Sequence, residues 1–241
     1  MILIPVMRET FGHARGFHKE TLEGTTNIRI YGQPTDVTSM KARLLVVYCD
    51  PNPKSFTHAV LEAVLAGLGD GCEVKTVDLY AEGFDPVLIV DEEHRRRDLD
   101  KVEATRAHRE QIAWCDTMVF VYPVWWGGFP AMLKGYLDRT FVSGLTYSFQ
   151  GRPKTAVFPA GLMRGKAADV FYTLDSPWWF ALLDPGWFSN LITVFRYCGF
   201  GPVRRHYLAR LKLTSDAQRV AWLGKVRAIA AGIRSLQESL N

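Results

Sequence analysis

The sequence predicts an α/β domain built on one doubly wound, five-stranded, mainly parallel sheet with helices on both faces. From residue 41 onward, short apolar runs alternate with amphipathic helical patterns, which is typical of strands joined by right-handed helical crossovers. Two of the runs, at 44–48 and 117–122, are apolar without interruption, as expected of strands covered on both faces. With 241 residues, 48% of them hydrophobic and 22% charged, the chain suits one such globular domain.

The five expected strands follow one another with a helix or a loop between each pair. Their positions are 44–48, 73–79, 117–122, 154–158 and a stretch within 203–208. The second run alternates between apolar and polar residues, so it is compatible with an edge of the sheet.

Helices are expected where apolar residues recur three and four positions apart. They begin near Thr57, in the second half of 91–116, near Met132, near Phe188 and near Ser215. Residues 1–39 lack this periodicity. We therefore predict an N-terminal extension over 1–39, partly ordered at best, ahead of a single domain at 40–241.

Composition excludes several classes of protein. The formal charge of +4, from 29 Lys and Arg against 25 Asp and Glu, is too small to indicate a nucleic-acid partner. The four cysteines form no C-x-x-C pair and the histidines have no metal-ligand spacing, so no metal site is expected. No apolar stretch reaches the roughly 18–20 residues of a membrane span, and the start lacks a signal-peptide pattern. We expect a reduced, cytoplasmic protein without a transmembrane segment.

The loop after the first strand, 49–57, lies where open α/β sheets bind ligands, beyond the carboxyl ends of the strands. It contains no glycine, so it is neither a dinucleotide-binding glycine loop nor a P-loop. Ser55 and Thr57 place hydroxyls beside the free N–H groups of a helix N-terminus, with Lys54 nearby, which favours a phosphate. The alternative interpretation is that Ser55 or Thr57 caps the helix.

The loop after the third strand, 122–130, has the sequence Tyr-Pro-Val-Trp-Trp-Gly-Gly-Phe-Pro. Its glycines let the backbone approach a ligand closely, and its aromatic rings offer flat faces. Trp125 and Trp126 therefore either stack on a planar heterocycle or cover the core. A tight Trp-Trp-Gly-Gly loop is poor core architecture, which favours the heterocycle.

Four stretches carry a resemblance to a known family. They are Ser55-Phe56-Thr57, the segment from Asp78 to Pro86, the segment from Pro123 to Phe141, and Cys198-Gly199-Phe200. Between Arg43 and about Leu211 the chain resembles the flavodoxin-like NAD(P)H:quinone oxidoreductases, a family that includes quinone reductases and modulator of drug activity B. The resemblance implies a flavodoxin-like fold and a bound flavin.

The resemblance also implies the roles of individual residues. Ser55, Phe56 and Thr57 would hold the phosphate or pyrophosphate of the flavin. The residues implied to line its isoalloxazine ring are Pro123, Val124, Trp125, Trp126 and Gly127, joined after the expected fourth strand by Pro159, Ala160 and Gly161.

Two positions depart from the family pattern. Asp50 stands where such enzymes often carry a histidine, and a carboxylate would repel phosphate. We therefore expect Asp50 to face the backbone or Lys54. No proton donor carries over from the family. Tyr172 is a candidate catalytic residue in its place, with a purely structural role as the alternative.

The activity implied is hydride transfer from NAD(P)H through the flavin to a quinone, with FAD ahead of FMN as cofactor and a homodimer as the assembly. The alternatives are an azo- or nitro-reductase, or a non-enzymatic flavodoxin-like regulatory subunit of an ion-efflux system. The aromatic segment 171–180, with Trp187 and Phe188, is interpreted as a dimer interface ahead of a core element or a ring-binding wall. The run Arg95-Arg96-Arg97 either contacts the 2′-phosphate of NADPH or forms a solvated helix face.

Overall fold

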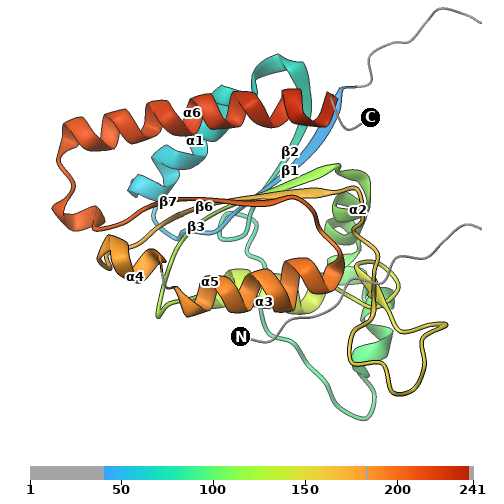
Figure 1. Cartoon of the computed structure of the whole chain (residues 1–241). Helices are drawn as coiled ribbons and strands as arrows, with labels where there is room; N and C mark the ends of the chain where they lie inside the picture. The colour runs from blue at the N-terminus through green and yellow to red at the C-terminus, as the bar shows by residue number, and fades with distance from the viewer. Residues whose placement is uncertain (1–40, 183, 239–241) are drawn as a thin grey trace, which may run out of the picture. The chain divides into compact units, whose positions relative to one another are not determined.

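The computed structural model describes residues 41–182 and 184–238, so the predicted extension at 1–39 lies outside the described residues. Its centre is a five-stranded sheet of order β2-β1-β3-β6-β7, in which every neighbouring pair is parallel (Figure 1). The strands are β1 (Ala42–Tyr48), β2 (Cys72–Asp78), β3 (Thr117–Pro123), β6 (Ala167–Thr173) and β7 (Val203–Leu208). The strand order reverses between β1 and β3, which is where open sheets of this kind bind ligands.

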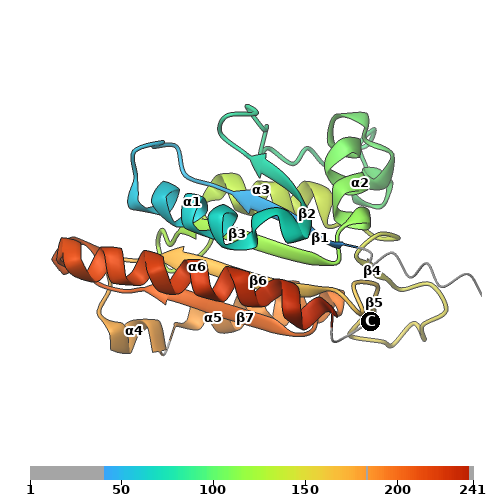
Figure 2. The ribbon, with the colours of Figure 1, turned by 90° about the horizontal axis from the view of Figure 1, so that it is seen from above.

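Helices cover both faces of the sheet, as Figures 1 and 2 show. On one face, α1 (Phe56–Leu68) lies beside α6 (Asp216–Glu238). Gly67 permits this close approach, because a Cβ there would lie 2.4 Å from the carbonyl oxygen of Arg227. The other face carries α2 (Arg106–Trp114), α3 (Ala131–Thr140) and α5 (Pro185–Asn190), which continues as a π-helix over Leu191–Arg196. A short helix, α4 (Trp178–Leu182), follows β6.

The predicted fold class is confirmed. Burial explains why the two uninterrupted apolar runs form central strands: almost every side chain of β1 and β3 is buried between the helical layers. The alternating strand β2 lies at an edge of the sheet, as its pattern indicated. The helices expected near Thr57, Met132, Phe188 and Ser215 all form.

The predicted fourth strand at 154–158 is wrong. Val157 is 79% exposed and Phe158 is 58% exposed, in a loop that also contains a two-stranded antiparallel pair, β4 (Tyr147–Ser148) with β5 (Ala160–Gly161). The fourth strand of the main sheet is instead β6, whose seven residues are all buried.

A single charged residue explains why the sequence pattern did not predict β6. Asp169 interrupts its apolar run, yet the side chain is fully buried. Two neighbours from β7 compensate the charge: Arg204 makes a two-pronged ion pair at 2.8 and 2.5 Å, and His206 Nε2 lies 2.9 Å from the carboxylate. Buried charges are tolerated when paired in this way.

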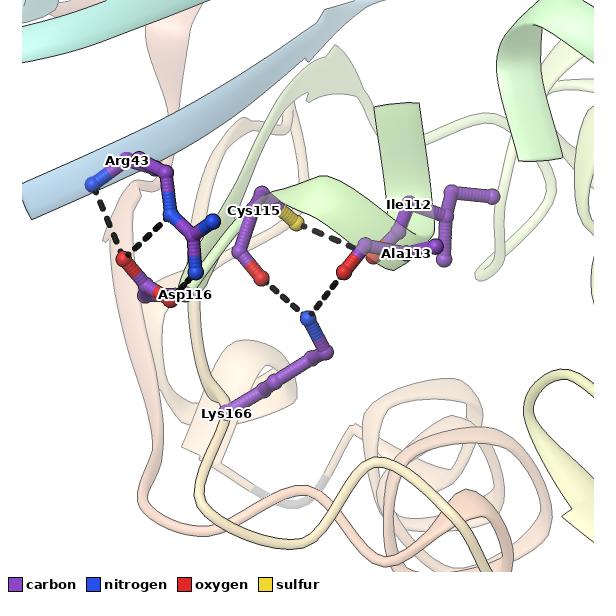
Figure 3. Close-up of polar contacts among 6 residues, drawn as sticks. All are labelled: Arg43, Ile112, Ala113, Cys115, Asp116 and Lys166. Carbon is purple, nitrogen blue, oxygen red and sulfur yellow. Dashed lines mark hydrogen bonds and ion pairs between the residues drawn. The ribbon is translucent and has the colours of Figure 1, made fainter. Parts of the chain in front are cut away.

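The amino edge of the sheet, opposite the ligand-binding edge, is closed by polar contacts (Figure 3). Arg43 at the start of β1 donates two hydrogen bonds to Asp116, at 3.1 and 2.7 Å. Lys166, just before β6, donates to the carbonyl oxygens of Ala113 and Cys115 at the end of α2. A lysine at a helix C-terminus satisfies carbonyl groups that the helix leaves free.

Candidate functional site

The loops that follow β1, β3 and β6 lie together at the carboxyl edge of the sheet. The first two of these loops both contact Thr173, the last residue of β6. The Thr173 hydroxyl lies 3.1 Å from the hydroxyl of Thr57 at the start of α1. The Thr173 carbonyl accepts a hydrogen bond of 2.8 Å from the N–H of Val124. Both threonines are buried. The structure therefore joins the two sequence-predicted loops through one residue of β6.

The N-terminus of α1 presents free N–H groups at this edge of the sheet. Ser55 caps the helix, with its hydroxyl accepting a hydrogen bond of 3.1 Å from the N–H of His58. The first-turn N–H groups of Phe56 and Thr57 have no intrahelical acceptor, and the helix dipole favours negative charge beside them. Asp50 does face the backbone: its carboxylate accepts a hydrogen bond of 2.9 Å from the N–H of Asn52. The capping and anion-binding interpretations of this loop are thus compatible.

Arg219 reaches the same helix end from α6. Its guanidinium carbon lies 6.0 Å from the centre of the Phe56 ring, and it is held by Asp216 at 3.3 Å and by the carbonyl of Leu211 at 3.1 Å. Its Nε is buried and has no hydrogen-bond partner within the described residues. Sequence reasoning missed Arg219, because nothing in its own helical pattern shows that the start of α6 meets the start of α1.

The aromatic loop after β3 is a tight turn. Trp125 and Gly128 pair through two backbone hydrogen bonds, of 3.3 and 3.1 Å. Between them Trp126, with φ 51°, and Gly127, with φ 70°, adopt left-handed backbone conformations. Such a conformation is uncommon for a bulky residue and clusters at functional sites. Trp126 is fully exposed, so its ring is available as a flat surface.

The inner side of this loop is closed by the start of α5. A Cβ on Gly186 would lie 1.7 Å from the carbonyl oxygen of Gly127, so the two backbones touch. Asp184 caps α5 by accepting a hydrogen bond of 3.1 Å from the N–H of Trp187. The cavity left between loop and helix is about 10 Å³, which holds at most one water. The inner side of the turn is therefore too narrow for a flat ring, whereas the Trp126 side chain is exposed on the turn.

Tyr172 lies in the core. It pairs in register with Tyr122 of β3 and with Tyr207 of β7, and its ring stacks on both, at centroid distances of 5.9 and 5.6 Å. Burial raises the pKa of Tyr172 to about 12, with Arg205 acting in the opposite direction. The hydroxyl thus stays protonated, and its role as a proton donor stays a prediction.

Cys49, at the end of β1, is also buried. Burial raises the pKa of its thiol to about 12. A protonated thiol is a poor nucleophile, so this edge of the sheet offers no activated cysteine.

The expected place of Pro159, Ala160 and Gly161 is corrected. They do not follow a strand of the main sheet but precede β6, near its amino edge. A Cβ on Gly161 would lie 2.5 Å from the backbone nitrogen of Gly199, just before β7. The loop that does follow the fourth strand is 174–177. The error follows directly from placing the fourth strand too early.

The remaining predicted segments differ in burial and in position. Phe171, Tyr172 and Trp187 are buried, whereas Trp178, Trp179 and Phe188 are exposed. Arg96 and Arg97 begin a 3-10 helix, Arg96–Lys101, that packs near α3, and Arg95 immediately precedes it. Across the described ranges, no cluster of three or more His, Cys, Asp or Glu residues is arranged to hold a metal ion. None of the helices there is long and apolar enough to cross a membrane.

Comparison with known proteins identifies the family to which this fold belongs. A family model described as having a flavodoxin-like fold matches residues 42–229. The chain belongs to this flavodoxin-like family.

Two named relatives are similar to this chain over part of their length. The Escherichia coli (strain K12) protein named "Uncharacterized NAD(P)H oxidoreductase YcaK" is 34% identical over 108 residues, which is 44% of this chain and 55% of that protein. The guinea pig (Cavia porcellus) "NAD(P)H dehydrogenase [quinone] 1" is 28% identical over 149 residues, 54% of this chain and 52% of that protein. The match thus spans about half the length of each relative.

Among solved structures, Smu.1420 from Streptococcus mutans UA159 superposes with a TM-score of 0.74 at 36% sequence identity. The superposition covers 79% of this chain and 99% of that chain. The similarity therefore extends over nearly the whole of the described domain.

Proposed function

We propose that the protein is a flavin-dependent NAD(P)H:quinone oxidoreductase. The observation that carries the proposal is the meeting of an anion-binding helix end and an exposed aromatic turn at Thr173, on the ligand-binding edge of a flavodoxin-like sheet. The printed names of the Escherichia coli and guinea pig relatives support nicotinamide-dependent oxidoreduction, and the second supports a quinone acceptor.

The described residues fit a flavin nucleotide. Phe56 and Thr57 would receive its phosphate through their N–H groups, and the unpartnered Nε of Arg219 would add a second, cationic contact. Two anion contacts at this end suit a diphosphate, so we propose FAD, with FMN as the alternative. Pro123, Val124, Trp125, Trp126 and Gly127 would border the isoalloxazine ring on the outward side of their turn.

When bound, a flavin supplies the two-electron chemistry, taking hydride from NAD(P)H and delivering it to the acceptor. The part of this chain is to bind and orient. The rigid turn closed by Trp125 and Gly128 would fix the ring plane, and the Trp126 side chain would shield it from water. Ring-on-ring transfer needs no side-chain nucleophile, which agrees with the protonated thiol of Cys49.

We propose that the protein works as a cytoplasmic homodimer. Trp178, Trp179, Phe188 and Ile192 are large apolar side chains that are 62%, 53%, 48% and 55% exposed in and around α4 and α5. Exposed aromatic residues of this kind mark interfaces more often than ordinary surface. In the described residues all four cysteines are free thiols, as in proteins of reducing compartments.

Spectroscopy tests the proposal. Purified protein should show the visible absorption of a flavin, lose it on anaerobic addition of NADPH or NADH, and regain it on addition of a quinone. Chromatography of the released cofactor distinguishes FAD from FMN. Replacing the quinone by an azo or nitro compound identifies the preferred acceptor. A protein that stays colourless after incubation with either flavin would reject the proposal, and one that binds flavin without oxidising NAD(P)H would favour a regulatory subunit.

A further inference from the structure

A second cavity, separate from the aromatic turn, opens between the end of β7 and the first half of α6. Its volume is about 450 Å³, within the range of small-molecule sites. One wall is apolar, formed by Leu208, Ala209, Leu213 and Ala221. The lining also includes residues with polar groups: Arg210, Thr214, Gln218, Trp222 and Lys225.

Hydrogen-bond donors around this cavity lack acceptors. The Trp222 indole nitrogen, Nε1, is buried without a hydrogen-bond partner within the described residues, and an indole N–H can only donate. Gln218 uses its side-chain oxygen to accept from the N–H and the hydroxyl of Ser215, which leaves its amide N–H groups as donors. A buried unpaired donor is costly, so the Trp222 N–H favours an acceptor in the cavity, and the exposed Gln218 amide offers further donors beside it.

The charge around the cavity has one sign. Arg210 and Lys225 both line it, and across the described ranges neither side chain has an ion-pair partner. The lining includes no aspartate or glutamate. Nearby cations elsewhere are paired, as Lys212 is with Asp175 at 3.0 Å. Donors without acceptors, and cations without acids, are complementary to an anion.

We propose that this cavity binds an organic anion, a carboxylate carried on an apolar or aromatic body. The carboxylate would accept from Trp222 Nε1 and Gln218 and be neutralised by Arg210 and Lys225. The body would lie against the wall that contains Leu208 and Leu213. The cavity is separate from the aromatic turn, because none of its lining residues belongs to the three loops that meet at Thr173, although Leu208 pairs in register with Thr173.

Two probes that differ only in charge test this site: naphthoate and the uncharged naphthalenemethanol. Binding is measured by calorimetry and by the NMR signal of the Trp222 indole N–H, which is assigned from its loss in Trp222→Phe. Naphthoate should bind and move that signal, and naphthalenemethanol should do neither. Trp222→Phe should weaken naphthoate binding about tenfold or more, the loss expected for a hydrogen bond to a charged group.

Variants that remove a positive charge from the cavity test the proposal even if Trp222→Phe fails to fold. Arg210→Gln and Lys225→Gln should each weaken naphthoate binding about threefold, as expected for partly exposed ion pairs. Arg227→Gln, an exposed position of α6 outside the cavity, is the matched control and should leave binding unchanged. Equal affinity for the two probes, an unmoved Trp222 signal, or equal effects of Arg210→Gln and Arg227→Gln would overturn the proposal.

Discussion

Arg219 is a single side chain that links the first turn of α6 to the first turn of α1. It stacks over Phe56 beside the N–H groups that we assign to a flavin phosphate, with its Nε unpaired. Arginine suits this position because its planar group can both stack on a ring and donate to phosphate oxygens.

We expect Arg219→Gln to weaken flavin binding about tenfold or more, since a charge-assisted hydrogen bond is lost. Titration of the apoprotein with FAD and with FMN, followed by fluorescence, measures the change. Arg227→Gln on the same helix should bind both flavins like the wild type. If the two variants behave alike, Arg219 does not contact the cofactor.

Tyr172 has two candidate roles, proton donor or structural core residue, and its burial favours the structural one. The ring completes a stack with Tyr122 and Tyr207, and the hydroxyl has a pKa of about 12 because it is buried. A group that must exchange protons with a bound substrate needs a path to it and a pKa near the working pH.

Tyr172→Phe should therefore keep its flavin and retain NAD(P)H oxidation within about threefold, because it preserves the aromatic stack. The rate with a saturating quinone, measured across pH, provides the comparison with the wild type. A loss of a hundredfold or more, with flavin content intact, would instead establish Tyr172 as the proton donor.

At the scale of elements, β6 replaces the strand expected at 154–158. The two segments differ in burial: Val170 of β6 is fully buried, whereas Val157 is 79% exposed. A charge is costly only where water cannot reach it.

The same substitution at both positions tests this placement. Val170→Asp should unfold the domain or destabilise it by more than about 4 kcal/mol, while Val157→Asp should change its stability by no more than about 0.5 kcal/mol. Urea unfolding followed by circular dichroism gives both values. Comparable losses of unfolding free energy at the two sites would instead support a buried strand at 154–158.

Asp169 couples β6 to β7 and makes the stability of the pair depend on pH. Burial acts to raise its pKa, but hydrogen bonds and charges from Arg204 and His206 outweigh burial and lower it. A lowered pKa in the folded state stabilises the protein above the ordinary carboxyl value of about 3.9, and that stabilisation is lost as pH falls through the folded-state pKa.

We expect Asp169→Asn to cost about 3–5 kcal/mol at neutral pH, because it leaves Arg204 without its buried partner. The difference from the wild type should begin to shrink as the pH falls below about 4, where the unfolded carboxyl takes up a proton, and it should go on shrinking until the pH passes the lowered pKa of the folded state. Asp98→Asn, at an exposed pair with Lys101, is the control and should unfold at nearly the same urea concentration as the wild type. A pH-independent difference would show that the charge of Asp169 is not what matters.

At the scale of the whole molecule, the exposed apolar residues around α4 and α5 are the surface that we assign to a second copy of the chain. Ile192→Glu places a charge among Trp178, Trp179 and Phe188 and should convert a dimer into a folded monomer. Sedimentation velocity measures the mass, and circular dichroism checks the fold. Leu213→Glu, equally apolar in the wild type and 73% exposed beside α6, should leave the dimer intact. A wild type that is monomeric at every concentration would remove the assignment.

Local pattern was enough to determine the α/β class, the central strands β1 and β3, the edge strand β2 and the starts of the main helices. Each of these depends on the periodicity of neighbouring residues, which the chain carries wherever it folds. The same pattern located Ser55, Thr57 and Trp126 at the ends of strands, because loops after parallel strands share one edge of the sheet.

Only the tertiary structure decided the rest. Asp169 lies within a buried strand because Arg204 and His206, far along the chain, neutralise it, and no local pattern contains that compensation. Arg219 meets Phe56, and Gly186 touches Gly127, only because helices distant in sequence fold against the same edge. Contacts of this kind depend on the shape of the whole domain, so the residues that make them cannot be identified from their own surroundings in the sequence.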